Sequence, residues 1–271
     1  MTDLALDQVS YRYPGGRDLA LDDVGLRIAP GERVALVGQN GSGKTTLVRH
    51  LNGLLRPTTG RILHDGADVR PRTVAQLARS VGLVFQDPDR QIFSGTVRAE
   101  VEFGPRNLGL RGAELAAAVD DALTAVGLES EKATNPYDLG ASRRKLLALA
   151  SVLAMRTPVL VLDEPTTGQD LRGVAIVRRV MEGANLAGRT VVAISHDMEF
   201  VAAAFDRVVV MREGRILLDG APSSVFAEGA WQTLRSSYLE PPLAALAGAR
   251  LGLGSTPTDE ALLSALGRSA D

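Results

Sequence analysis

The sequence has no cysteine, little lysine and almost no net charge. The absence of cysteine from its 271 residues excludes disulfides, thiolate metal sites and cysteine nucleophiles. Among 30 basic residues only Lys44, Lys132 and Lys145 are lysines, so each of them stands out. The formal net charge of −2 gives no case for broad attraction to nucleic acid, and we predict no nucleic-acid partner.

Long hydrophobic runs are also missing, although 45% of the residues are apolar, as in ordinary globular proteins. A helix that spans a bilayer needs about 20 consecutive apolar residues. The longest run, Leu146–Met155, is much shorter, contains Ser151 and suits a buried helix. The first residues are acidic and lack the basic and apolar regions of a signal peptide. If the protein acts at a membrane, other chains must supply the spans.

Short apolar runs rich in β-branched residues alternate with helix-length segments. Continuous apolar runs are typical of strands that are buried on both faces of a parallel sheet. The expected strands are Val34–Val37, Gly82–Phe85, Val159–Leu162, Val191–Ile194 and Val208–Met211. The expected helices between them are Thr45–Leu54, Leu171–Leu186 and Met198–Phe205. This alternation predicts a layered α/β domain.

Three regions depart from this alternation. Turn residues at 53–60 and 65–72 predict connections between shorter antiparallel strands. Residues 87–157 predict a helical subdomain inserted between two strands, with helices at 113–127 and 143–155. Beyond Gly220 the expected elements are short helices at 222–226, 243–251 and 258–266. We therefore expect one domain over residues 1–228 and a short helical tail over 229–271.

A complete G-x-x-x-x-G-K-T motif follows the strand expected at Val34–Val37 and opens a helix, which is the context of a phosphate-binding loop. Its glycines let backbone N–H groups close around phosphate oxygens, and the helix N-terminus adds a favourable dipole. The lysine reaches the β- and γ-phosphates, and the threonine hydroxyl binds Mg²⁺. The expected nucleotide-binding residues are Gly38, Gln39, Asn40, Gly41, Ser42, Gly43, Lys44, Thr45 and Thr46.

Two acids end another apolar strand. Asp163 can hold Mg²⁺ opposite the phosphate loop, and Glu164 can polarise an attacking water as a general base. Alone, such a pair is more often a solvated turn, but beside a phosphate loop it indicates a catalytic site. His196 follows a strand at the edge where α/β sheets bind ligands, and can contact a γ-phosphate and the water. We expect His50 and His64 to be structural.

The order of these motifs resembles that of the ATP-binding-cassette (ABC) ATPases over about residues 4–225. The resemblance implies a P-loop NTPase core of the RecA type with an added antiparallel β subdomain, and ATP and Mg²⁺ as ligands. Gln86 stands at the place of the family's Q-loop, Asp170 in its D-loop and His196 at its switch histidine. Tyr13 lies where the family stacks an aromatic ring on adenine, with Tyr11 as the competing choice.

Roles for individual residues follow from the same resemblance. Its implied catalytic residues are Glu164, His196 and Gln86, and its implied Mg²⁺ contacts are Thr45, Gln86 and Asp163. Within the family, the chain is most similar to the ATPases of energy-coupling-factor importers, which take up vitamins or transition-metal ions. This likeness lies in Val84–Phe93, Phe103–Gly109 and a short tail with Pro241–Pro242.

The importer likeness also implies partners. These are a second ABC ATPase subunit, a transmembrane coupling subunit that docks on the segment after the Q-loop, and a substrate-binding membrane subunit. The chain is then expected at the cytoplasmic face of the cell membrane, as a peripheral subunit. The alternatives are a soluble ABC ATPase that is not linked to transport, or an ATP-binding regulatory subunit with little hydrolysis.

The signature segment departs from the family pattern, Leu-Ser-Gly-Gly-Gln. The aligned residues here are Leu139, Gly140, Ala141, Ser142 and Arg143. In family dimers this segment binds the γ-phosphate of the ATP that the opposite subunit holds. Gly140 lacks the hydroxyl donor, and the side chains of Ala141 and Ser142 restrict the close approach that glycine allows. Arg143 places a positive charge in a first helical turn, which the helix dipole disfavours unless an anion lies nearby.

Two interpretations of this departure remain open. Either Ser142 and Arg143 replace the missing donors and the site stays active, or the site that this signature completes is impaired. We predict a heterodimer with one competent and one weakened site, with a homodimer as the alternative. The competent site is then the one built on this chain's own phosphate loop, provided that the partner's signature is intact. Gln169, where the family commonly has leucine, is a second departure and lies in the D-loop.

Overall fold

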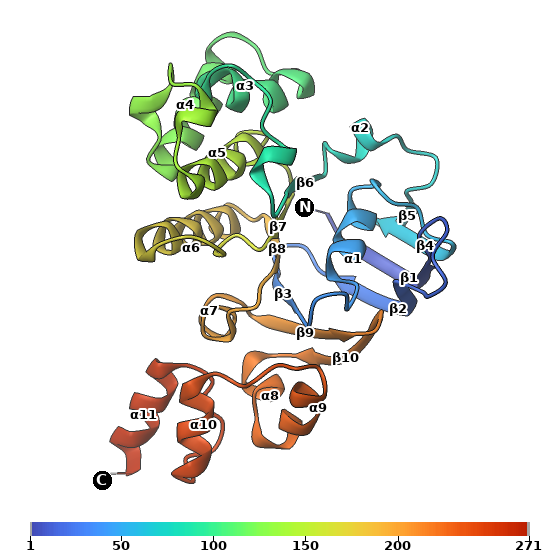
Figure 1. Cartoon of the computed structure of the whole chain (residues 1–271), viewed down its shortest axis with the longest axis vertical. Coiled ribbons are helices and arrows are strands. Elements are labelled where there is room, and N and C mark those ends of the chain that lie inside the picture. Colours follow the sequence, from blue (N-terminus) through green and yellow to red (C-terminus); the bar gives the residue numbers. More distant parts are fainter. Residues whose placement is uncertain (1, 270–271) are drawn as a thin grey trace.

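A six-stranded sheet forms the centre of the molecule (Figure 1). The computed structural model describes residues 2–269. The strand order is β10-β9-β3-β8-β7-β6, in which β10 pairs antiparallel with β9 and the other pairings are parallel. Alternate residues of β3 join two hydrophobic clusters, one on each face of the sheet. The bounds are β3 Arg33–Val37, β6 Val81–Val84, β7 Val159–Asp163, β8 Thr190–Ile194, β9 Arg207–Arg212 and β10 Arg215–Gly220.

A second, antiparallel sheet with the order β2-β1-β4-β5 lies beside the first (Figure 1). Leu4 and Leu6 of its strand β1 share one hydrophobic cluster with Leu47 and Leu51 of helix α1. This shared burial fixes the helix that follows the phosphate loop against both sheets. The bounds here are β1 Leu4–Tyr11, β2 Leu21–Ile28, β4 Thr59–His64, β5 Ala67–Asp68, α1 Lys44–Leu51 and α2 Val74–Leu77.

Three helices, α3, α4 and α5, pack on one another at one end of the molecule (Figure 1). The chain enters them after β6 and returns from them to β7, which is the neighbouring strand. Gly109 and Gly127 end α3 and α4 in the left-handed conformation that glycine allows. The bounds are η1 Pro88–Arg90, α3 Val97–Leu108, α4 Gly112–Val126, η2 Glu129–Glu131, η3 Pro136–Asp138 and α5 Ala141–Leu153.

Helices α6 and α7 each begin at an aspartate that follows a site strand. The Asp170 carboxylate accepts a hydrogen bond from the Gly173 amide at 2.7 Å, and Asp197 accepts one from the Phe200 amide at 2.9 Å. Such N-caps satisfy amides that the helix itself cannot pair. They therefore fix where the chain turns after β7 and β8. The helices are α6 Leu171–Leu186 and α7 Met198–Ala204.

The carboxyl-terminal helices lie at the opposite end of the molecule from α3–α5 (Figure 1). They are α8 Pro222–Val225, η4 Glu228–Ala230, α9 Trp231–Ser236, α10 Leu243–Arg250 and α11 Asp259–Ser269. Thr256 donates a hydrogen bond to the Ala244 carbonyl at 2.8 Å, which ties the segment after α10 to that helix. The outer ends of the two predicted domains, residues 1 and 270–271, lie outside the described residues. Across residues 2–269, no helix combines the length and the apolar character that crossing a membrane requires.

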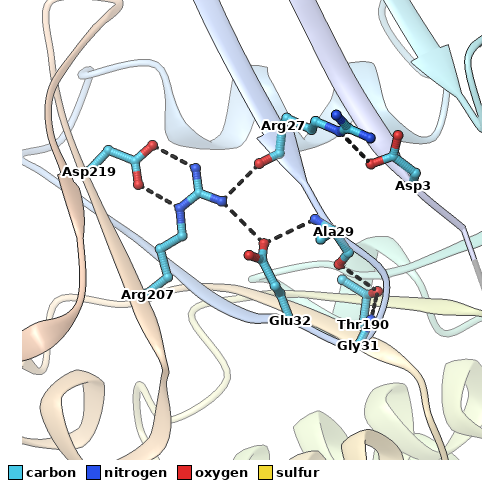
Figure 2. Close-up of polar contacts among 8 residues, drawn as sticks. All are labelled: Asp3, Arg27, Ala29, Gly31, Glu32, Thr190, Arg207 and Asp219. Atoms are coloured by element: carbon cyan, nitrogen blue, oxygen red, sulfur yellow. Dashed lines mark hydrogen bonds and ion pairs between the residues drawn. The ribbon is translucent and has the colours of Figure 1, made fainter.

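A polar network joins the two sheets (Figure 2). Arg207 of β9 donates to both carboxylate oxygens of Asp219 on β10, at 2.6 and 2.7 Å. The same guanidinium donates to the Arg27 carbonyl of β2 at 2.8 Å and to Glu32 at 3.2 Å. Because a planar guanidinium binds several acceptors in a fixed geometry, one residue holds β2 of one sheet against β9 and β10 of the other.

Most predicted elements form, with shifted ends. Helix α1 begins at Lys44 and ends at Leu51, three residues before the predicted end, since Gly53 adopts a positive φ. Helix α5 begins at Ala141 rather than at residue 143, so positions 141–143 of the signature lie in its first turn. Strands β1 and β2 were not placed individually from the sequence, because irregularities at Gln8 and Asp23, where φ is 50° and 51°, interrupt the alternation of apolar and polar residues.

Candidate functional site

The phosphate loop between β3 and α1 has a backbone that only glycine permits at its ends. Gly38 has a φ of 148°, and a Cβ there would lie 2.2 Å from the Met211 carbonyl oxygen. Gly43 has a φ of 104°, and a Cβ there would lie 2.6 Å from the Ala20 carbonyl oxygen. The loop is therefore packed against β9 and against the residue before β2, which leaves its shape little freedom.

Lys44 turns back over this loop. Its Nζ donates to the carbonyl oxygens of Gly38 and Gln39, at 2.7 and 2.9 Å. Burial lowers the pKa of Lys44, while the nearby carboxylates of Glu164 and Asp163 act in the opposite direction. The carbonyl oxygens hold the Lys44 ammonium near Asp163 and Glu164 without neutralising its charge. The ammonium is therefore placed to offset the negative charge of an anionic ligand in the loop.

The loop opens onto a cavity of about 230 Å³. Its walls come from the loop and the start of α1, from the segment after β6, from the ends of β7 and β8 with the residues that follow them, and from the turn before β2. The lining residues are Tyr13, Ala20, Asn40, Gly41, Ser42, Gly43, Lys44, Thr45, Thr46, Gln86, Asp163, Glu164, Ile194 and His196. The predicted residues Gly38 and Gln39 lie in the loop but do not line the cavity, and Ala20 and Ile194 line it without having been predicted.

The choice between the two tyrosines is decided by packing. The Tyr13 side chain is 39% exposed, lines the cavity and lies 3.0 Å from the Thr46 hydroxyl through its own hydroxyl. Tyr11 is buried and stacks edge-to-face on His50, with ring centroids 4.8 Å apart. Burial raises the pKa of Tyr11, as expected for a phenol inside the core. Tyr13 is the ring available to a ligand, and Tyr11 is part of the core.

Thr45 and Asp163 meet at the floor of the cavity. The Thr45 hydroxyl donates to Asp163 Oδ2 at 3.1 Å, whereas Asp163 Oδ1 is buried without a hydrogen-bond partner. Burial raises the pKa of Asp163, and the hydrogen bond from Thr45 opposes that rise. A hydroxyl and an unpartnered carboxylate oxygen, with the Gln86 amide in the same cavity, form the oxygen-rich donor set that Mg²⁺ prefers.

Glu164 is held in a strained conformation directly after β7. Its φ of 53° lies in the left-handed region, which is uncommon for residues other than glycine. Thr167 donates to Glu164 Oε2 at 3.1 Å, and His196 Nε2 lies 2.9 Å from Glu164 Oε1 without the alignment of a hydrogen bond. Burial raises the pKa of Glu164 and lowers that of His196, so both groups are shifted toward their neutral forms. Thr167 was not predicted to contact Glu164, because a spacing of three residues carries no such signal outside a helix.

The signature residues lie away from this cavity. None of the five, Leu139 to Arg143, is among its lining residues. Arg143 forms an ion pair with Glu131 at 2.5 Å, so an acidic neighbour within the chain offsets its charge in the first turn of α5. Ser142 instead contacts Gln169 in the loop that follows β7. The predicted D-loop residue Asp170 is the N-cap of α6.

The remaining residues singled out by the sequence have local partners. Lys145 donates to the Thr167 carbonyl at 2.6 Å, close to this chain's own Glu164, and Lys132 pairs with Asp120. Phe93 and Phe103 are 61% and 49% exposed, and their rings meet edge-to-face.

His50 and His64, which were expected to be structural, are buried and do not line the cavity. His50 is buried and its Nδ1 lies 2.8 Å from the Thr46 carbonyl oxygen. His64 is buried and its Nε2 lies 2.9 Å from the Leu51 carbonyl oxygen. The His50 contact lies within α1, whereas His64 joins β4 to the end of α1.

The sequence is similar to ATP-binding proteins of transporters. Residues 21–167 match the family model described as ABC transporter. The chain is 43% identical over 242 residues to the cobalt import ATP-binding protein CbiO of Rhodobacter capsulatus, which covers 89% of this chain and 85% of that protein. It is 40% identical over 234 residues to the energy-coupling factor transporter ATP-binding protein EcfA of Methanocaldococcus jannaschii, which covers 86% of this chain and 83% of that protein.

Solved structures share the fold. The structure of cbiO1 from Clostridium perfringens, described as part of the ABC transporter complex cbiONQ, has a TM-score of 0.75 at 38% identity and covers 86% of this chain and 94% of that one. A dimeric ATP-binding cassette in a post-hydrolysis state, bound to ADP and Pi, has a TM-score of 0.73 at 26% identity. The match covers 80% of this chain and 98% of that one. Together with the sheet topology, these confirm the predicted P-loop NTPase α/β fold.

Proposed function

Because the chain belongs to the ABC transporter family, as an ATP-binding subunit with ATPase activity, we propose that it drives a membrane importer of the energy-coupling-factor type. The cargo class we propose is a vitamin or a transition-metal ion. The names of two relatives, one a cobalt import protein and the other an energy-coupling factor protein, support this assignment. In the proposed complex the chain is one half of an ATPase heterodimer at the cytoplasmic face of the membrane, bound to a transmembrane coupling subunit and a substrate-binding membrane subunit.

One observation carries the catalytic part of the proposal. Lys44, Thr45, Asp163, Glu164 and His196 come from three separate segments and line a single cavity. A phosphate loop alone occurs in many nucleotide-binding proteins. The carboxylate pair beside it, with Glu164 in a strained backbone and beside His196, supports hydrolysis rather than binding alone.

Each residue then has a defined task. The amides of loop 38–43 and Lys44 bind the phosphates, and Tyr13 stacks on the adenine from the open side of the cavity. Glu164 takes the proton of the attacking water as general base. Thr167 orients the Glu164 carboxylate, and His196 contacts the γ-phosphate and the same water.

Thr45, Asp163 and Gln86 would hold Mg²⁺, since their oxygens meet beside the phosphate loop. When bound, the ion would offset charge on the β- and γ-phosphates. Asp163 needs its carboxylate form for this, although burial raises its pKa. The unpartnered Oδ1 of Asp163 supports this assignment, because a buried carboxylate oxygen without a donor is costly unless a cation approaches it.

The altered signature supports an asymmetric dimer. In family dimers a signature completes the opposite subunit's site, and a dimeric cassette is among the structural neighbours. The charge of Arg143 is paired with Glu131, and Ser142 bonds within its own chain, so neither side chain is free to replace a missing phosphate donor without giving up a contact. The site built on this chain's phosphate loop is the competent one, and the partner's site is weakened.

A paired substitution tests both claims. ATP turnover is measured on the complex purified with its second ATPase subunit, after Glu164→Gln or the equivalent change in the partner. Loss of the general base in this chain is expected to lower turnover by about 10²-fold or more. The partner change is expected to cost less, because its site is already slow.

The control is Glu182→Gln, a partly exposed carboxylate on α6 that pairs with Arg178. It removes a charge without touching the cavity and is expected to leave turnover unchanged. Turnover retained by Glu164→Gln would contradict catalysis at this site. Equal losses from the two subunits would contradict the asymmetry and leave hydrolysis itself supported.

A further inference from the structure

Two residues that depart from the family pattern bind each other. The Ser142 hydroxyl donates to Gln169 Oε1 at 2.6 Å, and Gln169 Nε2 donates to the Ser142 carbonyl at 3.1 Å. Ser142 lies in the first turn of α5, and Gln169 lies in the loop between β7 and α6. The pair is partly buried, and the Gln169 amide both accepts a hydrogen bond from the Ser142 side chain and donates one to the Ser142 backbone.

Room for this pair is made by a glycine on a third segment. Gly173 lies in the first turn of α6, where its backbone is helical and has no need of glycine. A Cβ at Gly173 would lie 2.0 Å from Gln169 Oε1 and 2.9 Å from its Cδ. Glycine inside a helix is less favourable than alanine, so the local helix gains nothing from this residue. Its one visible benefit is space for the Gln169 amide.

The same loop is held by α5 at a second point and connects directly to the catalytic carboxylate. Lys145, one turn further along α5, donates to the Thr167 carbonyl at 2.6 Å. Thr167 in turn donates through its hydroxyl to Glu164 Oε2 at 3.1 Å. A continuous series of contacts therefore runs from the helix that carries the signature to the general base of this chain's own site.

We infer that Ser142, Gln169 and Lys145 are positioning residues, which fix the loop 165–170 to α5 and through Thr167 hold Glu164 in place. The inference rests on the proposed function, because it concerns the placement of that general base. Displacement of α5, the helix that faces the partner's nucleotide in the proposed dimer, then displaces the loop that orients Glu164. The two departures from the family pattern are one unit, which couples the partner's site to this one.

Gly173→Ala tests this without altering the signature, the cavity or any residue that bonds to Glu164. The new Cβ expels the Gln169 amide and breaks the pair with Ser142. We expect kcat for ATP to fall about three- to tenfold with an unchanged KM, because a misplaced catalytic group costs rate rather than binding. Gln169→Ala is expected to give the same loss. The double variant is expected to fall no further than the worse single, since both remove one interaction.

The matched control is Gly183→Ala on the same helix, where a Cβ meets no atom within 4 Å. Gly183→Ala raises the helix propensity of α6 by the same amount as Gly173→Ala, and it is expected to keep the wild-type kcat. Hydrogen exchange provides a readout that does not depend on turnover. In Gly173→Ala and Gln169→Ala the amides of residues 166–170 and of the first turn of α5 are expected to exchange faster, and in Gly183→Ala they are expected to stay protected.

The outcomes separate the two proposals. The positioning role is overturned if Gly173→Ala has the same kcat and the same amide hydrogen exchange as Gly183→Ala. Faster exchange in only one of the two segments also overturns it, because the pair would then not join them. Failure of the proposed function shows separately, as turnover that survives Glu164→Gln.

Discussion

At the scale of single residues, the site buries two carboxyl groups whose charge the protein offsets only in part. Asp163 and Glu164 are adjacent and buried, and burial raises the pKa of both carboxyl groups. Thr45, Thr167 and Lys44 stabilise the charged forms in part. Burial of these carboxyl groups lowers the stability of the fold, which fits the proposed role of the site in holding Mg²⁺ and the attacking water.

The pKa shift of Glu164 predicts how stability depends on pH. A carboxyl group whose pKa is raised in the folded state destabilises the fold at pH values above that pKa, and the penalty disappears as the pH falls through it. Glu164→Gln is therefore expected to raise the Tm at pH 8 by about 2–4 °C, the shift that ~1 kcal/mol gives in a chain of this size. At pH 4.5 the gap between variant and wild type is expected to be smaller.

The measurement is thermal unfolding of both proteins across that pH range without nucleotide. Glu213→Gln serves as the control, since this carboxylate is 71% exposed and remains in contact with water. A Tm gap for Glu164→Gln that is constant or grows toward acid would show that burial of the carboxylate charge is not the cause.

At the scale of elements, the first turn of α5 joins three features. It carries the signature, it contacts the loop after β7, and it lies at the end of the helical layer that α3 and α4 complete. The N-cap residue of α5 is Gly140, which has no side chain to accept a hydrogen bond from the first-turn amides. Serine and threonine are favoured at this position because they provide one. The departure from the family pattern thus weakens the local helix as well as removing a hydroxyl donor.

A partial restoration of the signature tests its role. Gly140→Ser with Ala141→Gly returns the hydroxyl and removes one Cβ, but keeps Ser142 and Arg143 with their contacts. No atom lies within 4 Å of a Cβ at Gly140 and its φ is −62°, so serine fits. If the partner's site is slow for want of these groups, turnover of the complex is expected to rise severalfold.

Gly140→Ser alone is the control for stability, and its N-cap is expected to leave the Tm unchanged or raised. Unchanged turnover in the double variant would support the alternative that the existing side chains already supply what the site needs.

At the scale of the whole molecule, the nucleotide cavity lies between two ends with different surfaces. The helices α3–α5 form one end and the tail helices the other (Figure 1). Phe93 and Phe103 form an exposed aromatic pair in the segment after β6, which is where the importer likeness places the transmembrane subunit. Adjacent exposed aromatic side chains are typical anchors of an interface.

Removing this pair is expected to separate the ATPase from its membrane partner. Phe93→Ala with Phe103→Ala is expected to weaken recovery of the membrane subunits by tenfold or more, because interface anchors cost about 2 kcal/mol or more when truncated. Nucleotide binding is expected to stay normal, since neither ring lines the cavity. The measurement is co-purification from detergent extract at matched expression.

Leu186→Ala is the control at an apolar side chain that is 89% exposed on α6. It is expected to leave recovery unchanged. Full recovery of the complex with both phenylalanines removed would place the docking surface elsewhere.

The fold class and the place of the phosphate loop between a strand and a helix could be predicted from local sequence patterns. The phosphate-loop spacing and the acids after an apolar strand are local features, because a few consecutive residues fix the backbone that the chemistry needs. Helix α6 was predicted with its observed bounds, as its caps and periodicity are also local. The predicted end of α1 and the predicted start of α5 differ from the observed ones, since packing decides how far a helix continues.

Which side chains meet depends on the tertiary structure. The sequence gives no reason to prefer Tyr13 over Tyr11, but Tyr11 is buried in the core against His50 and does not line the cavity. The contact of Ser142 with Gln169 joins residues 27 positions apart, on a helix and a loop that different strands position. Such contacts depend on how whole elements pack, and packing is a property of the assembled core that no short segment carries.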